Sequence, residues 1–291
     1  MAQMSPDLGA LEGPVLAFGG PYGNLAAVRA VQAAAQRLGI PPERCICTGD
    51  VVAYFAHPQE TTDALRSWGA RVILGNCEES VAAGSPDCGC GFEPGSACSA
   101  LAAEWYRFTA GQLTRDTITW MAALPRQLRF TLGGRTWRVI HGGVDRINRF
   151  VFPSTPAAVK SAQIEAAGTD GVIAGHSGIP FGERVGRGWW LNAGAAGLPA
   201  NDGAPGGWYL LLHPVRDALR VSWHRLVYDP APEQDAMARH GLSTAYAEAL
   251  STGLWPSLDV LPEAERRRTG APLDPPALEI PGGSARESRR G

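Results

Sequence analysis

Four short polar fragments, each directly after an apolar stretch typical of a β-strand, constrain this chain more than any other feature. The fragments are Gly49-Asp50, Gly75-Asn76-Cys77-Glu78, His141-Gly142 and Gly175-His176-Ser177-Gly178. Open α/β sheets gather functional groups at the carboxyl ends of their strands, so we expect the four fragments to meet. A carboxylate, an amide and two imidazoles around one point suit Mn²⁺, Fe²⁺ or Zn²⁺. The sequence therefore predicts that Asp50, Asn76, His141 and His176 bind a divalent metal ion.

Each of these four residues also has an ordinary structural explanation when it is taken alone. An aspartate after a strand often caps a helix or closes a turn, and an asparagine after glycine commonly lies in a turn. A histidine at a strand end is often only a hydrogen-bonded residue at the rim of a sheet. The combination of all four is what favours metal binding.

The order of strand-like and helix-like segments predicts an α/β fold with four layers, α/β/β/α, and a helical cap. Apolar β-formers alternate with amphipathic helices in the first part of the chain, which indicates a parallel core with right-handed crossovers. The expected strands here are 15–18, 44–48 and 71–74, and the expected helices are 24–38 and 59–68. Gly133-Gly134 predicts a hairpin whose second strand leads to His141. Antiparallel strands expected in 182–192, 208–212 and 219–227 would form the second sheet of a sandwich.

Changes in composition along the chain divide it into four parts. We expect a flexible N-terminus over residues 1–13 and one large domain over 14–228, with 77–124 inserted as a loop and helical cap. Two amphipathic helices follow in 229–261. Residues 262–291 are rich in proline, arginine and glycine, which predicts a disordered tail.

The overall composition is that of an ordinary globular protein. Apolar residues make up 45% of the 291 positions and charged residues 19%, with a net charge of −2. This balance gives no general attraction to nucleic acid or to an anionic membrane, so we expect a small-molecule partner and neither of those. There is no uninterrupted apolar run near 18 residues and no basic leader followed by an apolar one, so we expect a cytoplasmic protein. The oligomeric state is left open.

Three longer segments carry a resemblance to a known family. They are residues 49–60 (GDVVAYFAHPQE), 175–181 (GHSGIPF) and 192–199 (NAGAAGLP). Together with the four fragments, and in their order, they resemble the calcineurin-like metallophosphoesterases, in particular the branch related to bacterial phosphodiesterases and diadenosine tetraphosphatases. The resemblance covers about residues 14–228 and implies the fold of that family. It also implies hydrolysis of a small phosphorylated substrate, a phosphomonoester or a phosphodiester, by water that a metal activates.

The chain departs from the family pattern at three positions. Gly20 and Tyr22 stand where the family has the Asp and His of Asp-x-His-Gly-Asn, and Gly178 replaces the last His of Gly-His-x-His. In the family these three ligands belong to one of two metal positions. The resemblance therefore implies one metal ion per chain at Asp50, Asn76, His141 and His176, and leaves a second ion open, with Tyr22 as a candidate phenolate ligand.

The lost ligands leave three functional hypotheses. The first is a hydrolase with an atypical, mononuclear site, in which the four ligands also carry the catalytic chemistry. The second is a catalytically silent family member that binds metal or a phosphorylated ligand as a sensor or scaffold. The third is metal or redox chemistry outside phosphoester hydrolysis, at Tyr22 or the cysteines.

Further residues are candidates for additional ligands or for supporting contacts. Four cysteines, Cys77, Cys88, Cys90 and Cys98, lie in one short segment, a density compatible with zinc, iron, a disulfide or free thiols. Their spacing is not that of ordinary zinc ribbons. In a cytoplasmic protein we expect reduced thiols, and a metal or redox use rather than a structural disulfide. Glu78 is expected to support the ligands or to cap a helix, and Asn192 to orient His176 or close a turn.

Overall fold

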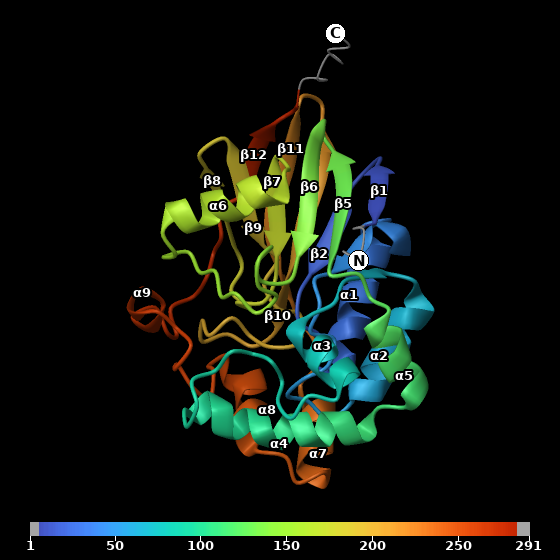
Figure 1. Ribbon diagram of the computed structural model, residues 1–291, viewed down its shortest axis with the longest axis vertical. Coiled ribbons are helices and arrows are strands. Elements are labelled where there is room, and N and C mark those ends of the chain that lie inside the picture. Colours follow the sequence, from blue (N-terminus) through green and yellow to red (C-terminus); the bar gives the residue numbers. More distant parts are fainter. Residues whose placement is uncertain (1–5, 284–291) are drawn as a thin grey trace.

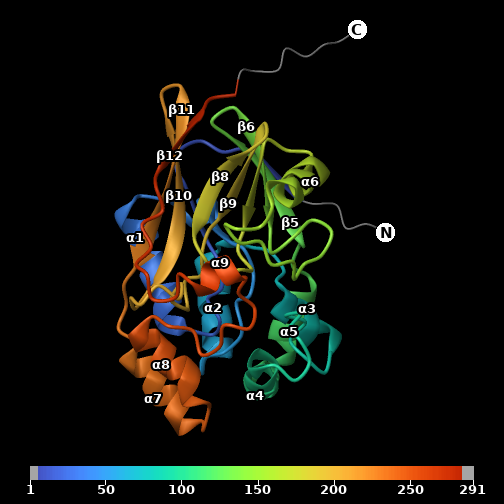
Figure 2. The ribbon, with the colours of Figure 1, turned by 90° about the vertical axis from the view of Figure 1, so that its left-hand side faces the viewer.

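The computed structural model describes residues 6–283, and its centre is a pair of six-stranded sheets packed face to face (Figures 1 and 2). Sheet 1 runs in the order β1 (Asp7–Ala10), β5 (Gln127–Leu132), β6 (Arg135–Ile140), β7 (Gly171–Ala174), β9 (Gly188–Asn192), β8 (Phe181–Val185). Sheet 2 runs in the order β12 (Leu278–Pro281), β11 (Ala218–Leu226), β10 (Gly207–Val215), β2 (Val15–Phe18), β3 (Cys45–Cys47), β4 (Arg71–Val72).

Burial patterns explain why these segments form strands. In β5 the buried residues are Leu128, Phe130 and Leu132, which alternate with partly exposed ones, so one face meets sheet 2 and the other is turned away from it. All four residues of β2 are buried because β10 and β3 flank it and other layers cover both faces. Phe130 and Trp137 of sheet 1 pack with Leu210 of sheet 2 in the core between the sheets.

Helices cover both outer faces of the sandwich. Helix α6 (Ala157–Ala167) packs on β7, β8 and β9 of sheet 1. Helices α1 (Leu25–Arg37) and α2 (Pro58–Trp68) pack on each other beside sheet 2, and α1 contacts β11. The expected two-sheet α/β fold is therefore confirmed.

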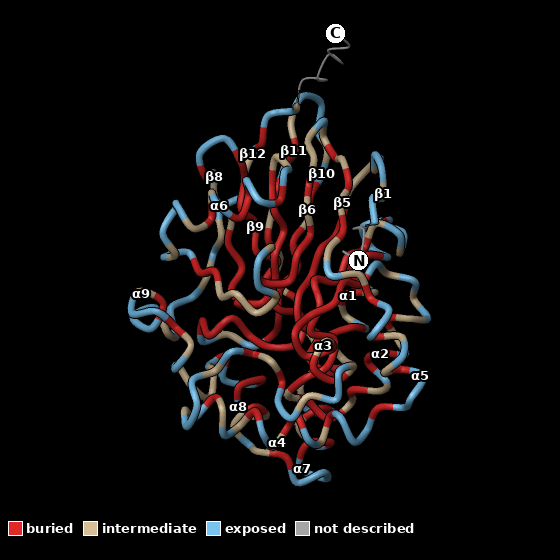
Figure 3. Tube along the Cα trace, in the orientation of Figure 1, coloured by how far each residue is buried: buried red, intermediate tan, exposed pale blue. Residues whose placement is uncertain are grey.

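Most of the remaining helices lie at the end of the molecule toward which β6 and β7 point (Figure 1). They are α3 (Asn76–Ala83), α4 (Ala97–Gln112), α5 (Arg115–Ala122), α7 (Ala231–Arg239) and α8 (Thr244–Thr252). The short helix α9 (Glu263–Arg266) lies at the side of the molecule, and the 3₁₀ turn η1 (Pro42–Arg44) lies beside β4. Buried residues in Figure 3 run along the strands and continue to the region around α3, so the strand ends are covered.

Two expectations about the sheets and the termini are wrong. Strands β8 and β9 do not share a sheet with β10 and β11: they extend sheet 1, while β10 and β11 pair with β2 in sheet 2. The ends of the chain are also ordered where they are described. β1 pairs in parallel with β5, and β12 pairs with β11, where Ile280 is fully buried. Residues 1–5 and 284–291, the rest of the expected flexible ends, lie outside the described residues.

Among residues 6–283, the structure contains no helix that is both long and apolar enough to cross a membrane.

Candidate metal centre

The four expected ligands come from two pairs of neighbouring parallel strands, one pair in each sheet. Asp50 follows β3 and Asn76 follows β4, and these strands pair in sheet 2. His141 follows β6 and His176 follows β7, and these strands pair in sheet 1. Because all four strands end on the same side of the sandwich, residues far apart in the chain meet there.

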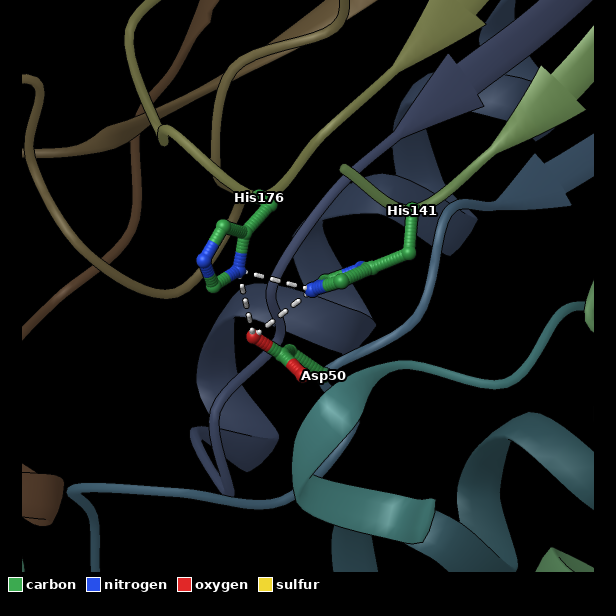
Figure 4. Close-up of side chains that lie close together, drawn as sticks. All are labelled: Asp50, His141 and His176. Carbon is green, nitrogen blue, oxygen red and sulfur yellow. Dashed lines mark hydrogen bonds and ion pairs between the residues drawn. The ribbon is translucent and has the colours of Figure 1, made fainter. Parts of the chain in front are cut away.

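Asp50, His141 and His176 point toward one another (Figure 4). Nε2 of His141 lies 3.2 Å from Oδ2 of Asp50 and 3.0 Å from Nδ1 of His176. Nδ1 of His176 lies 3.9 Å from the same Asp50 oxygen. Within the described part of the chain, this is the one group of three or more His, Cys, Asp or Glu side chains whose ligand atoms lie within 4.8 Å of one another, and all three residues are buried.

Asn76 turns its amide oxygen toward this group. Its Oδ1 lies 3.0 Å from Nε2 of His141, while its Nδ2 donates to the carbonyl oxygen of Cys88 at 2.9 Å. The carbonyl of Cys88 thereby fixes which end of the amide faces the histidines. The structure thus brings all four predicted ligands together, with one carboxylate oxygen, one amide oxygen and two imidazole nitrogens converging.

Hydrogen bonds leave the histidine nitrogens in the centre free to act as ligands. Nδ1 of His141 lies 2.7 Å from the carbonyl oxygen of Thr48, and since a carbonyl can only accept, that nitrogen carries the proton. When that ring is neutral, Nε2 carries its lone pair and faces the point where the polar atoms of Asp50, Asn76 and His176 converge. This arrangement is typical of metal-binding histidines, so the donors fit a divalent ion.

The charges of the three residues are strongly linked. Burial opposes ionisation of Asp50, but His141, and then His176, outweigh it and hold the pKa of Asp50 below its usual value. Burial lowers the pKa of His141, but the adjacent Asp50 carboxylate raises it by more than burial lowers it, so the net shift is upward. For His176 burial dominates and lowers the pKa. An ionised carboxylate therefore lies beside at least one neutral imidazole.

Glu78 supports the loop that carries Asp50. Its carboxylate accepts from the backbone N–H groups of Asp50 at 2.8 Å, Val52 at 3.2 Å and Gly75 at 2.9 Å. Asp50 has a φ of 55°, a conformation that side chains other than glycine rarely adopt, so this loop needs such support. Burial, followed by the charge of Asp50, raises the pKa of Glu78 to about 7. Glu78 thus lies in the first turn of α3, accepts from the N–H of the N-cap residue Gly75, and fixes the loop of a predicted ligand.

Two aromatic rings, those of Tyr22 and Trp255, occupy or adjoin the three positions, 20, 22 and 178, where the chain departs from the family pattern. A Cβ atom on Gly20 would lie 2.1 Å from Cζ of Tyr22, so the Tyr22 ring fills the space of a side chain at position 20. A Cβ atom on Gly178 would lie 3.5 Å from Cζ2 of Trp255, so that indole stands beside the place of the lost histidine. Burial, and then the charge of Asp50, raise the pKa of Tyr22 well above its usual value, so the phenol stays protonated when no ion is bound.

The cysteines do not form a cluster of free thiols. Cys88 and Cys90 are joined as a disulfide, contrary to the expectation of reduced thiols, while Cys77 and Cys98 are free. Gly89, with a φ of 64°, turns the chain so that the Cα atoms of Cys88 and Cys90 lie 5.3 Å apart, a separation that a disulfide can span. Cys77 and Cys98 are buried, and neither belongs to the metal-ligand group.

Asn192 does not orient His176 directly. Its Nδ2 donates to Oγ of Ser177 at 2.9 Å, and its Oδ1 accepts from the backbone N–H of Gly194 at 3.0 Å. The second contact closes the turn that was the alternative expectation. The Asn192 side chain therefore holds Ser177, the residue after His176, while the imidazole of His176 faces Asp50.

Sequence reasoning missed the pocket beside the metal centre. Tyr54, Tyr246 and Trp255 line it together with Asp50 and His176. Tyr246 and Trp255 lie far along the chain in a segment whose composition indicates only helices and loops. No local pattern could have found them, because their place is set by how α8 docks on the sandwich.

Comparisons with known proteins agree with this architecture. The calcineurin-like phosphoesterase superfamily domain matches residues 24–216, which begin just after Gly20 and Tyr22. A metallophosphoesterase from Sphaerobacter thermophilus is similar in structure, with a TM-score of 0.65 and 23% identity over 83% of this chain and 99% of that one. A protein from Pyrococcus horikoshii OT3 has a TM-score of 0.68 and 16% identity, over 83% and 99%. No curated protein matches the chain. Because the domain match spans most of the sequence and the sandwich is shared, this chain belongs to the calcineurin-like phosphoesterase superfamily.

Proposed function

We propose that the protein hydrolyses a phosphoester with the help of one divalent metal ion held by Asp50, Asn76, His141 and His176. The observation that carries this proposal is the convergence of their buried ligand atoms at the meeting point of the two sheets. The superfamily supports a phosphoesterase, and the donor set supports Mn²⁺, Fe²⁺ or Zn²⁺.

The aromatic rings of Tyr22 and Trp255 favour one bound ion per chain over two. The Tyr22 ring fills the place of a side chain at position 20, and the Trp255 ring lies beside the place of a side chain at position 178, the positions of two ligands of a second ion in the family pattern. Two thiols of the segment are tied in the disulfide and the other two lie outside the ligand group, so they do not rebuild that position. One ion per chain is therefore the arrangement that these side chains support.

The chain's own residues perform the remaining tasks. A bound divalent ion supplies acidification of water and polarisation of a phosphoryl oxygen. Asp50, Asn76 and the two histidines would hold it at the pocket wall, and Glu78 fixes the loop of Asp50. The apolar rings of Tyr22 and Trp255 line the same pocket as Asp50 and His176.

Metal content and turnover measured together test the proposal. We expect about one ion per chain by inductively coupled plasma mass spectrometry, and metal-dependent hydrolysis of methyl p-nitrophenyl phosphate or p-nitrophenyl phosphate. His176→Ala should lose both, whereas His213→Ala, at an exposed position of β10, should keep both. Two ions per chain would contradict the single site, and no turnover with any of the three metals would contradict hydrolysis.

A silent family member is the second candidate, because three ligands of the family pattern are absent at Gly20, Tyr22 and Gly178. Metal-dependent binding of a phosphonate without turnover of either ester would select it. We do not propose redox chemistry at the cysteines, since no cysteine joins the ligand group among the described residues.

A further inference from the structure

The pocket beside the metal centre has a wall of aromatic side chains. Tyr22, Tyr54, Phe150, Tyr246 and Trp255 line it, close to Asp50 and His176. The rings support one another: Tyr54 stacks on Tyr246 with centroids 4.4 Å apart and lies 4.8 Å from Tyr22. Phe150 lies 4.2 Å from the His176 ring. A ligand bound at the metal therefore meets rings on several sides.

The part of the wall from the C-terminal region is firmly anchored. Nε1 of Trp255 donates to the carbonyl oxygen of Pro199 at 2.6 Å, and its backbone N–H donates to Oδ1 of Asn201 at 2.9 Å. Helix α7, next to α8, is held by Glu233, which accepts from the backbone N–H of Ala56 at 2.6 Å. Tyr246 and Trp255 lie beyond residues 24–216, so this wall is not part of the matched family domain.

The pocket carries little positive charge. No lysine or arginine is among the residues that line it, and Asp50 is the one acidic residue there. Arg149, from the loop before Phe150, is bonded to Asp145 instead. One divalent cation beside one carboxylate leaves a net charge of about +1, which balances a single negative charge. A dianion or a polyphosphate would place uncompensated charge among aromatic rings, which is costly.

The pocket is also small. Its volume is about 50 Å³. A water molecule needs roughly 10–15 Å³ by this measure, so the pocket holds about three to five waters. A phosphoryl group fills that space, so an ester group would lie against the aromatic side chains without being enclosed, and a dinucleoside polyphosphate would not fit.

We infer that this pocket selects a small phosphodiester with one negative charge and an apolar or aromatic ester group. The inference rests on the function proposed above, since it names the substrate class of the same site. Tyr246 and Trp255 determine this specificity: their rings hold the ester group while the metal ligands hold the phosphoryl oxygens.

Two phosphonates that differ in charge test the inference by binding alone. Methyl phenylphosphonate is a monoanion and phenylphosphonate is a dianion at pH 8.5. Isothermal titration of the Mn²⁺-loaded protein should show the monoanion binding at least tenfold more tightly. Trp255→Ala and Tyr246→Ala should each weaken its binding, by about three- to tenfold for one lost aromatic contact. Leu254→Ala, which removes an exposed side chain from the same segment, should leave binding unchanged.

Equal or tighter binding of the dianion would overturn the inference, as would unchanged binding of the monoanion in both aromatic variants. If Trp255→Ala fails to fold, Phe150→Leu tests the same wall from a different loop. A further variant, Trp255→Arg, adds a cation to the pocket and should shift the preference toward the dianion.

The binding and turnover results separate this inference from the proposed function. If the monoanion binds preferentially but methyl p-nitrophenyl phosphate is not hydrolysed with any of the three ions, hydrolysis fails and the selectivity of the pocket stands. If p-nitrophenyl phosphate is hydrolysed and phenylphosphonate binds more tightly, hydrolysis stands and the selectivity fails.

Discussion

A single carboxylate, that of Glu78, organises much of the candidate metal centre without belonging to the predicted ligands. It accepts hydrogen bonds from three backbone N–H groups on two loops. Asp50 and Val52 lie on the loop after β3, and Gly75 lies on the loop after β4. These loops carry Asp50 and Asn76, so the distance between two metal ligands depends on one buried side chain.

Glu78→Gln should therefore weaken both the fold and the metal site. The amide has one accepting oxygen where the carboxylate has two, and its NH₂ group would face backbone donors. We expect a loss of about 1–3 kcal/mol in the free energy of unfolding, as for an unsatisfied buried group, and about 10–100-fold weaker metal binding. Urea unfolding and metal titration measure the two. Glu79→Gln, on the next residue, changes a half-exposed side chain bonded to Arg126 and should alter neither by much; an equal effect of both variants would contradict the role of Glu78.

Local sequence patterns predicted some of these residues and not others. The convergence of Asp50, Asn76, His141 and His176 follows from their places after strands, and their binding of metal stays a prediction. The Cys88–Cys90 disulfide could not be foreseen, because spacing alone allows several pairings and the deciding turn at Gly89 is a matter of backbone conformation.

Strands could be located from their composition, but their partners could not. The alternation of apolar residues placed β8 to β11 in the chain nearly where they lie, yet assigned all four to one sheet. Pairing depends on which edges are open once the sheets assemble, and β10 pairs with β2 from the beginning of the chain. For the same reason β12 was missed: its neighbours are polar and proline-rich, and one buried residue, Ile280, makes it a strand.

Ile280→Ala should show that the last strand stabilises the whole sheet. The side chain is fully buried in the core between the sheets, so its loss should lower the free energy of unfolding by about 2–5 kcal/mol. The matched variant Glu279→Ala, at an exposed position of β12, should change it by less than about 0.5 kcal/mol. Chemical denaturation followed by circular dichroism gives both values. If Ile280→Ala were as stable as Glu279→Ala, β12 would contribute little to the fold.

The metal centre lies between the two sheets, so metal binding should stabilise the molecule as a whole. Asp50 and Asn76 come from sheet 2, and His141 and His176 come from sheet 1. An ion present at 100 times its dissociation constant adds about 2.7 kcal/mol to the folded state. For a chain of 291 residues the melting temperature should then rise by roughly 4–5 °C.

Differential scanning calorimetry with Mn²⁺ and with a chelator measures that rise. His176→Ala should melt at the same temperature under both conditions, while His213→Ala should respond as the wild-type chain does. If the melting temperature of the wild-type protein were the same with Mn²⁺ and with the chelator, the four side chains would not bind the ion in the folded state.

The position of the aromatic wall in the chain has a consequence for biosynthesis. Domains fold as the ribosome releases them, from the N-terminus onward. The four predicted metal ligands all emerge by residue 176, whereas Tyr246 and Trp255 emerge later. A nascent chain halted before residue 246 would thus hold these ligands at an uncovered site. The aromatic wall that the inferred substrate selection needs would therefore form only after the ligands are in place.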